Sequence, residues 1–176
     1  PYIEEEVAYE NKDVGITLAG TLTLPSGDAP SPVVLLISGS GPQDRDGTIY
    51  GHHPFLVLAD YLTRQGIAVL RVDDRGVGES TGDFSNATSE DFASDVLAGI
   101  EYLKTRKEIN PEKIGLVGHS EGGLIAPIVA VKSPDVAFIV LMAGPGLTGE
   151  EILYLQGALI SRAMGVSEED IIKKRQ

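Results

Sequence analysis

The sequence has 176 residues, of which 42% are apolar and 23% are charged, and its formal net charge is −12. This length suits one domain with a sizeable core, whereas so acidic a surface repels a phosphate backbone and argues against nucleic acid as a partner. Cysteine is absent, which excludes disulfides, thiolate catalysis and cysteine-based zinc sites.

Apolar patterning predicts the first strands. Residues 14–24 carry β-branched and apolar side chains at partly alternating positions, so they predict a strand or one arm of a hairpin. Val33–Ile37 is a continuous apolar run, which is typical of a strand covered on both faces in a parallel sheet. The run ends in a glycine-rich turn at residues 38–41.

A helix is expected next. It begins at Pro54, because proline suits the first helical position, and it ends at Gly66. The apolar run Ile67–Val72 then predicts another strand, which ends in a charged turn at residues 73–76. Four apolar residues recur at helical spacing between the proline and the glycine: Phe55, Leu58, Ala59 and Leu62.

A second helix is indicated by a capping-box spacing at Thr88 and Asp91. Residues 110–111, Asn-Pro, are expected to break this helix, and residues 113–117 to form a short strand that runs into a second glycine-rich turn. Four apolar residues form the buried stripe of the helix: Phe92, Val96, Ile100 and Leu103.

The remaining pattern predicts a helix over about 121–132 and a buried strand over 137–142. From Thr148 the chain reads as helix, with a break near residues 165–167. Strands that alternate with helices predict an α/β fold with a mostly parallel sheet and helices on both faces.

Three turns rich in glycine or charge, at residues 38–47, 73–82 and 118–123, follow three of the predicted strands. In such sheets the binding sites form at the carboxyl ends of the strands. The three turns therefore predict one site at a single edge of the sheet.

The strongest chemical signal is a G-x-S-x-G pentapeptide centred on Ser120. It follows an apolar strand and opens a helix, as a nucleophile on a strained turn requires. Small residues at Gly118 and Gly122 let such a turn close around His119, and the helix start places backbone donors near a developing anion. The alternative is a serine that only caps the helix.

The sequence resembles the α/β-hydrolase superfamily, and more closely bacterial esterases and serine-peptidase-like hydrolases with a GHSEGG turn. The resemblance is carried by residues 35–47 (LLISGSGPQDRDG), 69–80 (VLRVDDRGVGES) and 114–123 (IGLVGHSEGG). It implies that Ser120 is the nucleophile and that the residue after it, Glu121, donates its backbone N–H to the oxyanion.

By the same resemblance, the turn after the first buried strand supplies the other oxyanion donor. The backbone N–H of Ser40 is the expected donor, and that of Gly41 is the alternative. A plain tight turn without a catalytic role is the competing interpretation of residues 38–41.

Residues 73–80 resemble the family's D-x-R-G-x-G-x-S loop. We expect a structural role, in which Arg75 pairs with a carboxylate and braces the loop. A catalytic role for Asp73 or Asp74 is the less favoured alternative. Residues 44–46, Asp-Arg-Asp, are expected to form a self-paired surface turn.

The sequence does not supply the partners that a serine nucleophile needs, namely a histidine base and an acid that orients it. Its three histidines, His52, His53 and His119, all precede Ser120, whereas the superfamily order is serine, acid, histidine. His119 adjoins Ser120 on the turn and points away from it. His52 and His53 are expected at the surface or at the helix start, and they do not predict a metal site.

We expect the acid and the histidine in a missing C-terminal part, because neither Asp135 nor Asp170 occupies a suitable place. Residues 1–147 are then the N-terminal part of an α/β-hydrolase core, and residues 148–176 the start of a helical cap or insertion. Residues 171–176 end in mid-helix without a stop signal.

The leading hypothesis is a carboxylic ester hydrolase that forms an acyl-enzyme on Ser120 and acts on a small-molecule ester or a short peptide, with no cofactor and no metal. A serine peptidase, an acyltransferase and a non-catalytic binding module of the same fold are the alternatives. A nucleotide-binding domain is disfavoured, because neither G-x-G-x-x-G nor a P-loop pattern occurs.

Assembly and location are less constrained. An incomplete sheet would expose an edge strand, so pairing into a homo-oligomer is predicted. No apolar stretch is long enough to predict a membrane span. The chain begins at Pro1 rather than Met, which suggests a processed or engineered start and leaves both the cytoplasm and export after signal removal open.

Overall fold

The computed structural model describes residues 1–27 and 29–173. It divides the chain into two compact units, residues 1–144 and residues 145–176. The predicted mid-helix ending at residues 171–176 falls partly on residues 174–176, which lie outside the described part.

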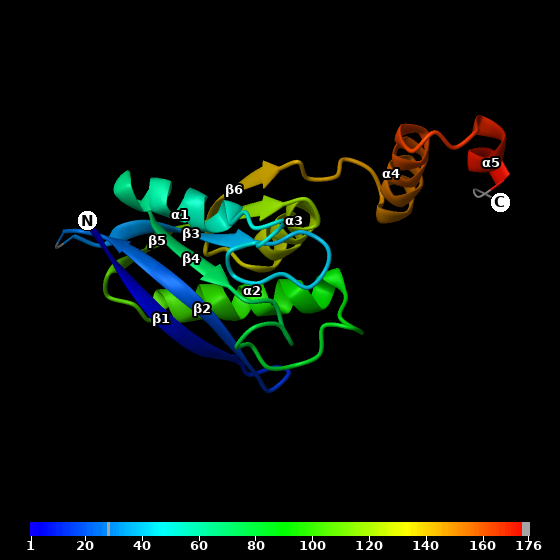
Figure 1. The fold of residues 1–176 in the computed structure, drawn as a ribbon. Helices are drawn as coiled ribbons and strands as arrows, with labels where there is room; N and C mark the ends of the chain where they lie inside the picture. The colour runs from blue at the N-terminus through cyan, green and yellow to red at the C-terminus, as the bar shows by residue number, and fades with distance from the viewer. Residues whose placement is uncertain (28, 174–176) are drawn as a thin grey trace. The chain divides into compact units, whose positions relative to one another are not determined.

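The first unit is built on one six-stranded sheet with the strand order β1-β2-β4-β3-β5-β6 (Figure 1). β1 and β2 form an antiparallel hairpin, and β2 also runs antiparallel to β4. The other pairs, β3 with β4, β3 with β5 and β5 with β6, are parallel, which confirms the predicted mostly parallel sheet. The strands are β1 (Tyr2–Asn11), β2 (Ile16–Pro25), β3 (Ser31–Ile37), β4 (Ala68–Val72), β5 (Ile109–His119) and β6 (Val136–Met142).

Helices cover both faces of this sheet, as predicted (Figure 1). On one face α1 (Pro54–Arg64) buries Phe55 and Ala59 against alternate side chains of β3 and β4. On the other face α2 (Ser89–Lys104) and α3 (Gly122–Lys132) pack on the opposite side chains of the same strands. Burial of each large apolar side chain contributes about 1.5–3 kcal/mol to the free energy of folding, so the two apolar layers stabilise the sheet.

Several predicted helix boundaries are confirmed. α1 begins at Pro54, and Gly66 follows its end with a φ of 89°, a backbone conformation that favours glycine. Thr88 and Asp91 form the capping box of α2 in both directions, through side chain to backbone hydrogen bonds.

One strand was missed and one helix end was predicted wrongly. β1 was not predicted, because glutamates mask its period of two; Glu5, Val7, Tyr9 and Asn11 are the inward-facing set. Asn110 and Pro111 lie inside β5 rather than ending α2, which stops at Lys104. Pairing with β3 is irregular between Ile109 and Ile114, so the proline removes no regular ladder bond there.

β6 was predicted as a buried strand, but most of its side chains are exposed, among them Phe138, Val140 and Leu141. The reason is its place at the end of the strand order, where within the described residues it pairs with β5 alone. Self-association through exposed surface of this kind stays a prediction.

The second unit contains α4 (Gly149–Ala163) and α5 (Glu168–Lys173). Thr148 and Glu151 form a capping box at the start of α4, and the predicted break falls at Gly165, whose φ is 78°. None of the residues of α4 is buried. In the described part of the chain, no helix has both the length and the apolarity needed to cross a bilayer.

Candidate active site

Ser120 lies between the end of β5 at His119 and the start of α3 at Gly122. Its φ is 53°, in the left-handed region that non-glycine residues rarely adopt and that costs about 1–3 kcal/mol. The Ser120 N–H donates to the Met142 carbonyl at 2.9 Å, and the Ser120 carbonyl accepts from Gly123 N–H at 2.8 Å. The predicted strand–turn–helix context of the serine is therefore present.

The glycines on either side of Ser120 are required by close backbone approach. A Cβ added to Gly118 would lie 2.0 Å from the Gly122 carbonyl oxygen, and one added to Gly122 would lie 2.3 Å from the Ile37 oxygen. Both distances are far inside van der Waals contact. The turn around Ser120 is thus packed directly against the end of β3.

The turn that follows β3 lies beside Ser120. A Cβ on Gly39 would be 3.1 Å from the Ser120 Cβ and 3.3 Å from the His119 Nδ1. Among the described residues, the backbone N–H groups of Ser40, Gly41 and Glu121 donate to no acceptor in the protein. The structure thus brings the two predicted turns together.

The predicted self-pairing of residues 44–46 was wrong. Arg45 reaches the loop after β4, where its Nη2 lies 2.7 Å from Asp73 Oδ2 and 2.7 Å from Glu79 Oε2. Asp46 pairs with Arg71 of β4, and Asp44 accepts from backbone N–H groups of its own turn. The side chains of Arg45 and Asp46 thus tie the turn to β4 and to the loop after it, while Asp44 holds the turn from within.

The Asp73 carboxylate is surrounded by hydrogen-bond donors from Arg45 and from the backbone of Glu79. Burial raises the pKa of this carboxyl, but hydrogen bonds from Arg45 and from the Glu79 N–H outweigh burial and hold the pKa below its usual range. Arg45 also donates its backbone N–H to Asp73 at 2.8 Å. Asp73 is therefore an ionised anchor for the 44–46 turn.

Arg75 pairs with a carboxylate, as predicted. Its Nε and Nη2 lie 2.7 Å and 2.9 Å from the two oxygens of Asp95 on α2, and Nη2 also donates to the Asp91 carbonyl at 2.7 Å. This bidentate pair fixes the loop after β4 to α2.

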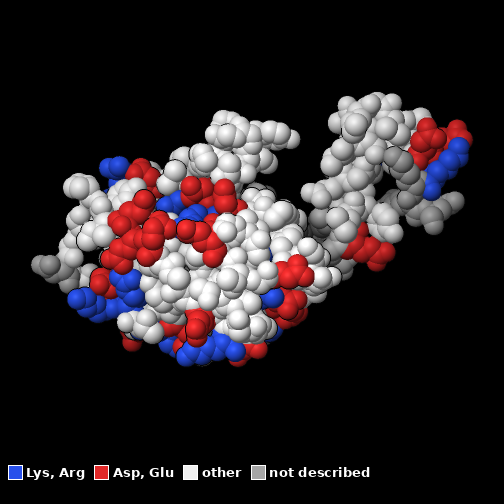
Figure 2. Space-filling view, turned by 60° about the horizontal axis from the view of Figure 1, so that its bottom comes forward, with Lys and Arg blue, Asp and Glu red and all other residues white. Residues whose placement is uncertain are grey.

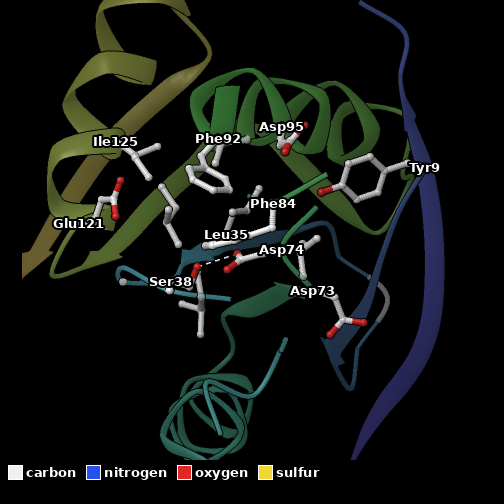
Figure 3. A pocket seen from close by; sticks show the side chains of 16 residues that line it. Tyr9, Leu35, Ser38, Asp73, Asp74, Phe84, Phe92, Asp95, Glu121 and Ile125 are labelled. Carbon is white, nitrogen blue, oxygen red and sulfur yellow. Dashed lines mark hydrogen bonds between the residues drawn. The ribbon is translucent and has the colours of Figure 1, made fainter. Parts of the chain in front are cut away.

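Asp74 is mostly buried and, within the described residues, pairs with no cation. Its Oδ1 accepts from Ser38 Oγ at 2.7 Å, drawn as a dashed line in Figure 3, and its Oδ2 accepts from Gln43 N–H at 2.9 Å. Burial raises the pKa of Asp74 to about 6, and the negative charges of Asp95 and Asp73 act in the same direction.

Asp74 is expected to make the protein less stable as the pH rises. Its pKa is about 6 in the fold and about 3.9 when unfolded. The folded state therefore binds more protons between these values, and stability that is present below pH 4 is lost as the pH passes 6. Between pH 5 and pH 8 the loss is on the order of 1 kcal/mol.

The Asp74→Asn variant removes this dependence, because the amide does not ionise. Urea unfolding at pH 5 and pH 8 measures the effect as the free energy of unfolding of the variant minus that of the wild type. This difference should be larger at pH 8. The same difference at both pH values would contradict the assignment.

A cavity is lined by Ser38, Asp73 and Asp74 (Figure 3). Its walls are apolar, with Phe84, Phe92 and Ile125 among them, while Asp74 and Glu121 contribute carboxylates. Gly39 and Gly41 also line it. Phe92 was identified in the sequence as a helix-stripe residue, but nothing in the pattern indicated Phe84, which lies in the irregular segment before α2.

The histidines do not complete a catalytic arrangement with Ser120. His52 and His53 are exposed, as predicted; His53 Nδ1 lies 3.0 Å from Thr48 Oγ1, and its side chain makes no cap hydrogen bond to α1. Within residues 1–27 and 29–173, no histidine is hydrogen-bonded to Ser120, and no three His, Asp or Glu residues are grouped as a metal site requires.

The face of the molecule drawn in Figure 2 carries acidic side chains, with basic side chains set among them. Arg45 illustrates this arrangement, since it contacts Glu6, Asp73 and Glu79. Arg45, Arg71 and Arg75 are each paired with a carboxylate of the protein.

Known proteins resemble this chain in sequence. The family model described as serine aminopeptidase, S33, matches residues 52–166. Esterase EstD of Thermotoga maritima is 33% identical over 161 residues, which are 88% of this chain and 38% of that protein. Dipeptidyl aminopeptidase BIII of Pseudoxanthomonas mexicana is 30% identical over 132 residues, which are 68% of this chain and 18% of that protein.

Solved structures share the fold. The Pyrococcus furiosus esterase Pf2001 superposes with a TM-score of 0.72 at 21% identity, over 97% of this chain and 59% of that chain. The α/β-hydrolase GrgF from Penicillium sp. sh18 superposes with a TM-score of 0.70 at 23% identity, over 92% of this chain and 54% of that chain. This chain thus spans less than two thirds of each of these relatives.

Proposed function

The chain belongs to the serine aminopeptidase S33 family of α/β-hydrolases, and from this premise we propose that it carries the nucleophile and oxyanion-binding half of a serine esterase. The observation that carries the proposal is Ser120, held with a φ of 53° between β5 and α3 and directly beside Gly39. A strained serine at this junction presents its hydroxyl away from its own backbone.

In the proposed reaction, Ser120 Oγ attacks the ester carbonyl carbon while a histidine takes its proton. The oxyanion accepts hydrogen bonds from the N–H of Glu121 and from that of Ser40, with Gly41 as the alternative donor. The histidine returns the proton to the leaving alcohol, and water then hydrolyses the acyl-enzyme. No cofactor takes part.

We propose that the acid and the histidine of this reaction come from residues outside the 176-residue sequence. The relatives support this, because the chain spans 38% of esterase EstD and 59% of the Pf2001 chain. Residues 148–176, which include α4 with its exposed side chains, are proposed to begin a helical cap or insertion.

Esters are favoured over peptides as substrates, since two of the relatives are named as esterases. A peptidase remains the second candidate, because the family name and the dipeptidyl aminopeptidase point to amide cleavage. Both reactions would use the same serine and the same oxyanion donors.

Assays of the whole protein that contains this chain separate the candidates. We expect hydrolysis of p-nitrophenyl acetate and of other short-chain p-nitrophenyl esters, and little release of p-nitroaniline from aminoacyl p-nitroanilides. A higher kcat/KM for the anilides would favour the peptidase. Binding of either substrate without turnover would favour a non-catalytic module.

A further inference from the structure

We infer that Asp74 is a positioning residue that clasps the turn 38–43 and thereby sets where the N–H groups of Ser40 and Gly41 lie relative to Ser120. The inference rests on the proposed function, because it concerns the donors proposed to bind the oxyanion. It adds a residue to the site whose side chain need not touch the substrate.

The clasp consists of hydrogen bonds to both ends of the turn. At the start of the turn, Ser38 Oγ donates to Asp74 Oδ1 at 2.7 Å, and at its end Gln43 N–H donates to Oδ2 at 2.9 Å. The Asp74 backbone N–H donates in return to the Gln43 carbonyl at 3.1 Å. One residue at the end of β4 thus fixes both ends of the turn that follows β3.

Between these ends the turn has little internal support. Residues 39–42 include two glycines, and Gly41 has a φ of 93°. The hydrogen bond recorded across the turn runs from Gln43 Nε2 to the Ser40 carbonyl at 3.5 Å, the limit for such a bond. The position of Ser40 and Gly41 therefore depends on the anchored ends.

The neighbouring aspartate shows the contrast. Asp73 is neutralised by Arg45, whereas among the described residues Asp74 faces no cation; Asp73 and Asp95, the carboxylates near it, are paired with Arg45 and Arg75. A mostly buried carboxylate without a cation reduces stability. The two oxygens of Asp74 instead hold the turn through the hydrogen bonds from Ser38 and Gln43.

Two substitutions distinguish the clasp from the charge. In Asp74→Asn, the side-chain oxygen can accept from Gln43 N–H and the amide can donate to Ser38 Oγ, so both ends stay tied. In Asp74→Ala both bonds are lost, while Ser38→Ala removes one. Asp135→Asn is the control for the loss of one carboxylate, because Asp135 pairs with Lys104 of α2 and does not line the cavity.

Steady-state hydrolysis of p-nitrophenyl acetate by the whole protein, at a temperature where every variant is folded by circular dichroism, provides the test. Since loss of an oxyanion donor costs about 10²–10³ in kcat, displacing one through Asp74→Ala should lower kcat by about 10–100-fold and change KM by less than about twofold. Asp74→Asn should retain kcat within about threefold, Ser38→Ala should be intermediate, and Asp135→Asn should resemble the wild type.

An unchanged kcat in Asp74→Ala would overturn the inference, as would an Asp74→Asn variant as slow as Asp74→Ala, or an Asp135→Asn variant as slow as either. If the wild type shows no Ser120-dependent hydrolysis, the proposed function fails instead. Amide hydrogen exchange of Gln43 and of residue 74, whose N–H groups form hydrogen bonds between the turn and the end of β4, then decides the clasp. Faster exchange in Asp74→Ala but not in Asp74→Asn supports it, and equal exchange in all three overturns it.

Discussion

Ser120→Ala is expected to lower kcat for ester hydrolysis by about 10⁴–10⁶-fold in the whole protein, because the variant has no atom that can form the acyl-enzyme. The KM should change little, since the backbone N–H groups proposed to bind the oxyanion are untouched. The free energy of unfolding should stay about the same. Alanine keeps the left-handed φ of 53°, and within the described residues the Ser120 hydroxyl has no hydrogen bond that the substitution would remove.

The matched control for this variant is Ser38→Ala, which also removes one hydroxyl at the site but is not proposed to attack the substrate. A Ser120→Ala variant that keeps more than about one hundredth of the wild-type kcat would show that another residue or water is the nucleophile. Any residual activity must be compared with the amount of wild-type protein that contaminates the Ser120→Ala sample.

Gly118→Ala is expected to destabilise the protein by about 3 kcal/mol or more. The added Cβ would lie 2.0 Å from the Gly122 carbonyl oxygen and 2.8 Å from the Gly123 nitrogen, and both are backbone atoms that cannot rotate away. The turn must open to accept it, which displaces Ser120 from Gly39. Stability and activity should therefore fall together.

Gly157→Ala is the control for the glycine substitution. Gly157 lies inside α4, and a Cβ there meets nothing within 4 Å, so alanine should be neutral or stabilise by up to about 1 kcal/mol. Urea unfolding compares the two variants. A Gly118→Ala variant as stable as the wild type would mean that the turn is not packed as described.

The parts of the fold that the sequence predicts well are those in which local pattern and tertiary packing agree. Continuous apolar runs became the parallel strands β3, β4 and β5, and the Thr88 capping box started α2. β1 escaped prediction because its glutamates face solvent between inward residues such as Val7 and Tyr9. The apolar content of β6 predicts a buried strand. Burial, however, depends on the strands and helices packed around it, which the sequence of one segment does not specify.

The candidate site follows the same division. Gly118, Ser120 and Gly122 lie within five consecutive residues, so their spacing alone predicts the turn. The partners of Arg45 and Asp74 come from a separate loop, and no local rule selects Asp73 for one and Ser38 for the other. Such pairings arise when the carboxyl ends of β3 and β4 meet, which only the assembled sheet determines.

Covalent labelling of Ser120 tests the central claim most directly. The whole protein that contains this chain is treated with a fluorophosphonate, and its intact mass is compared with that of the Ser120→Ala variant. The account predicts one phosphonyl adduct on the wild type, none on the variant, and loss of esterase activity in proportion to labelling. An adduct that persists in Ser120→Ala, or an active esterase that takes up no label, would contradict the assignment of Ser120 as the nucleophile.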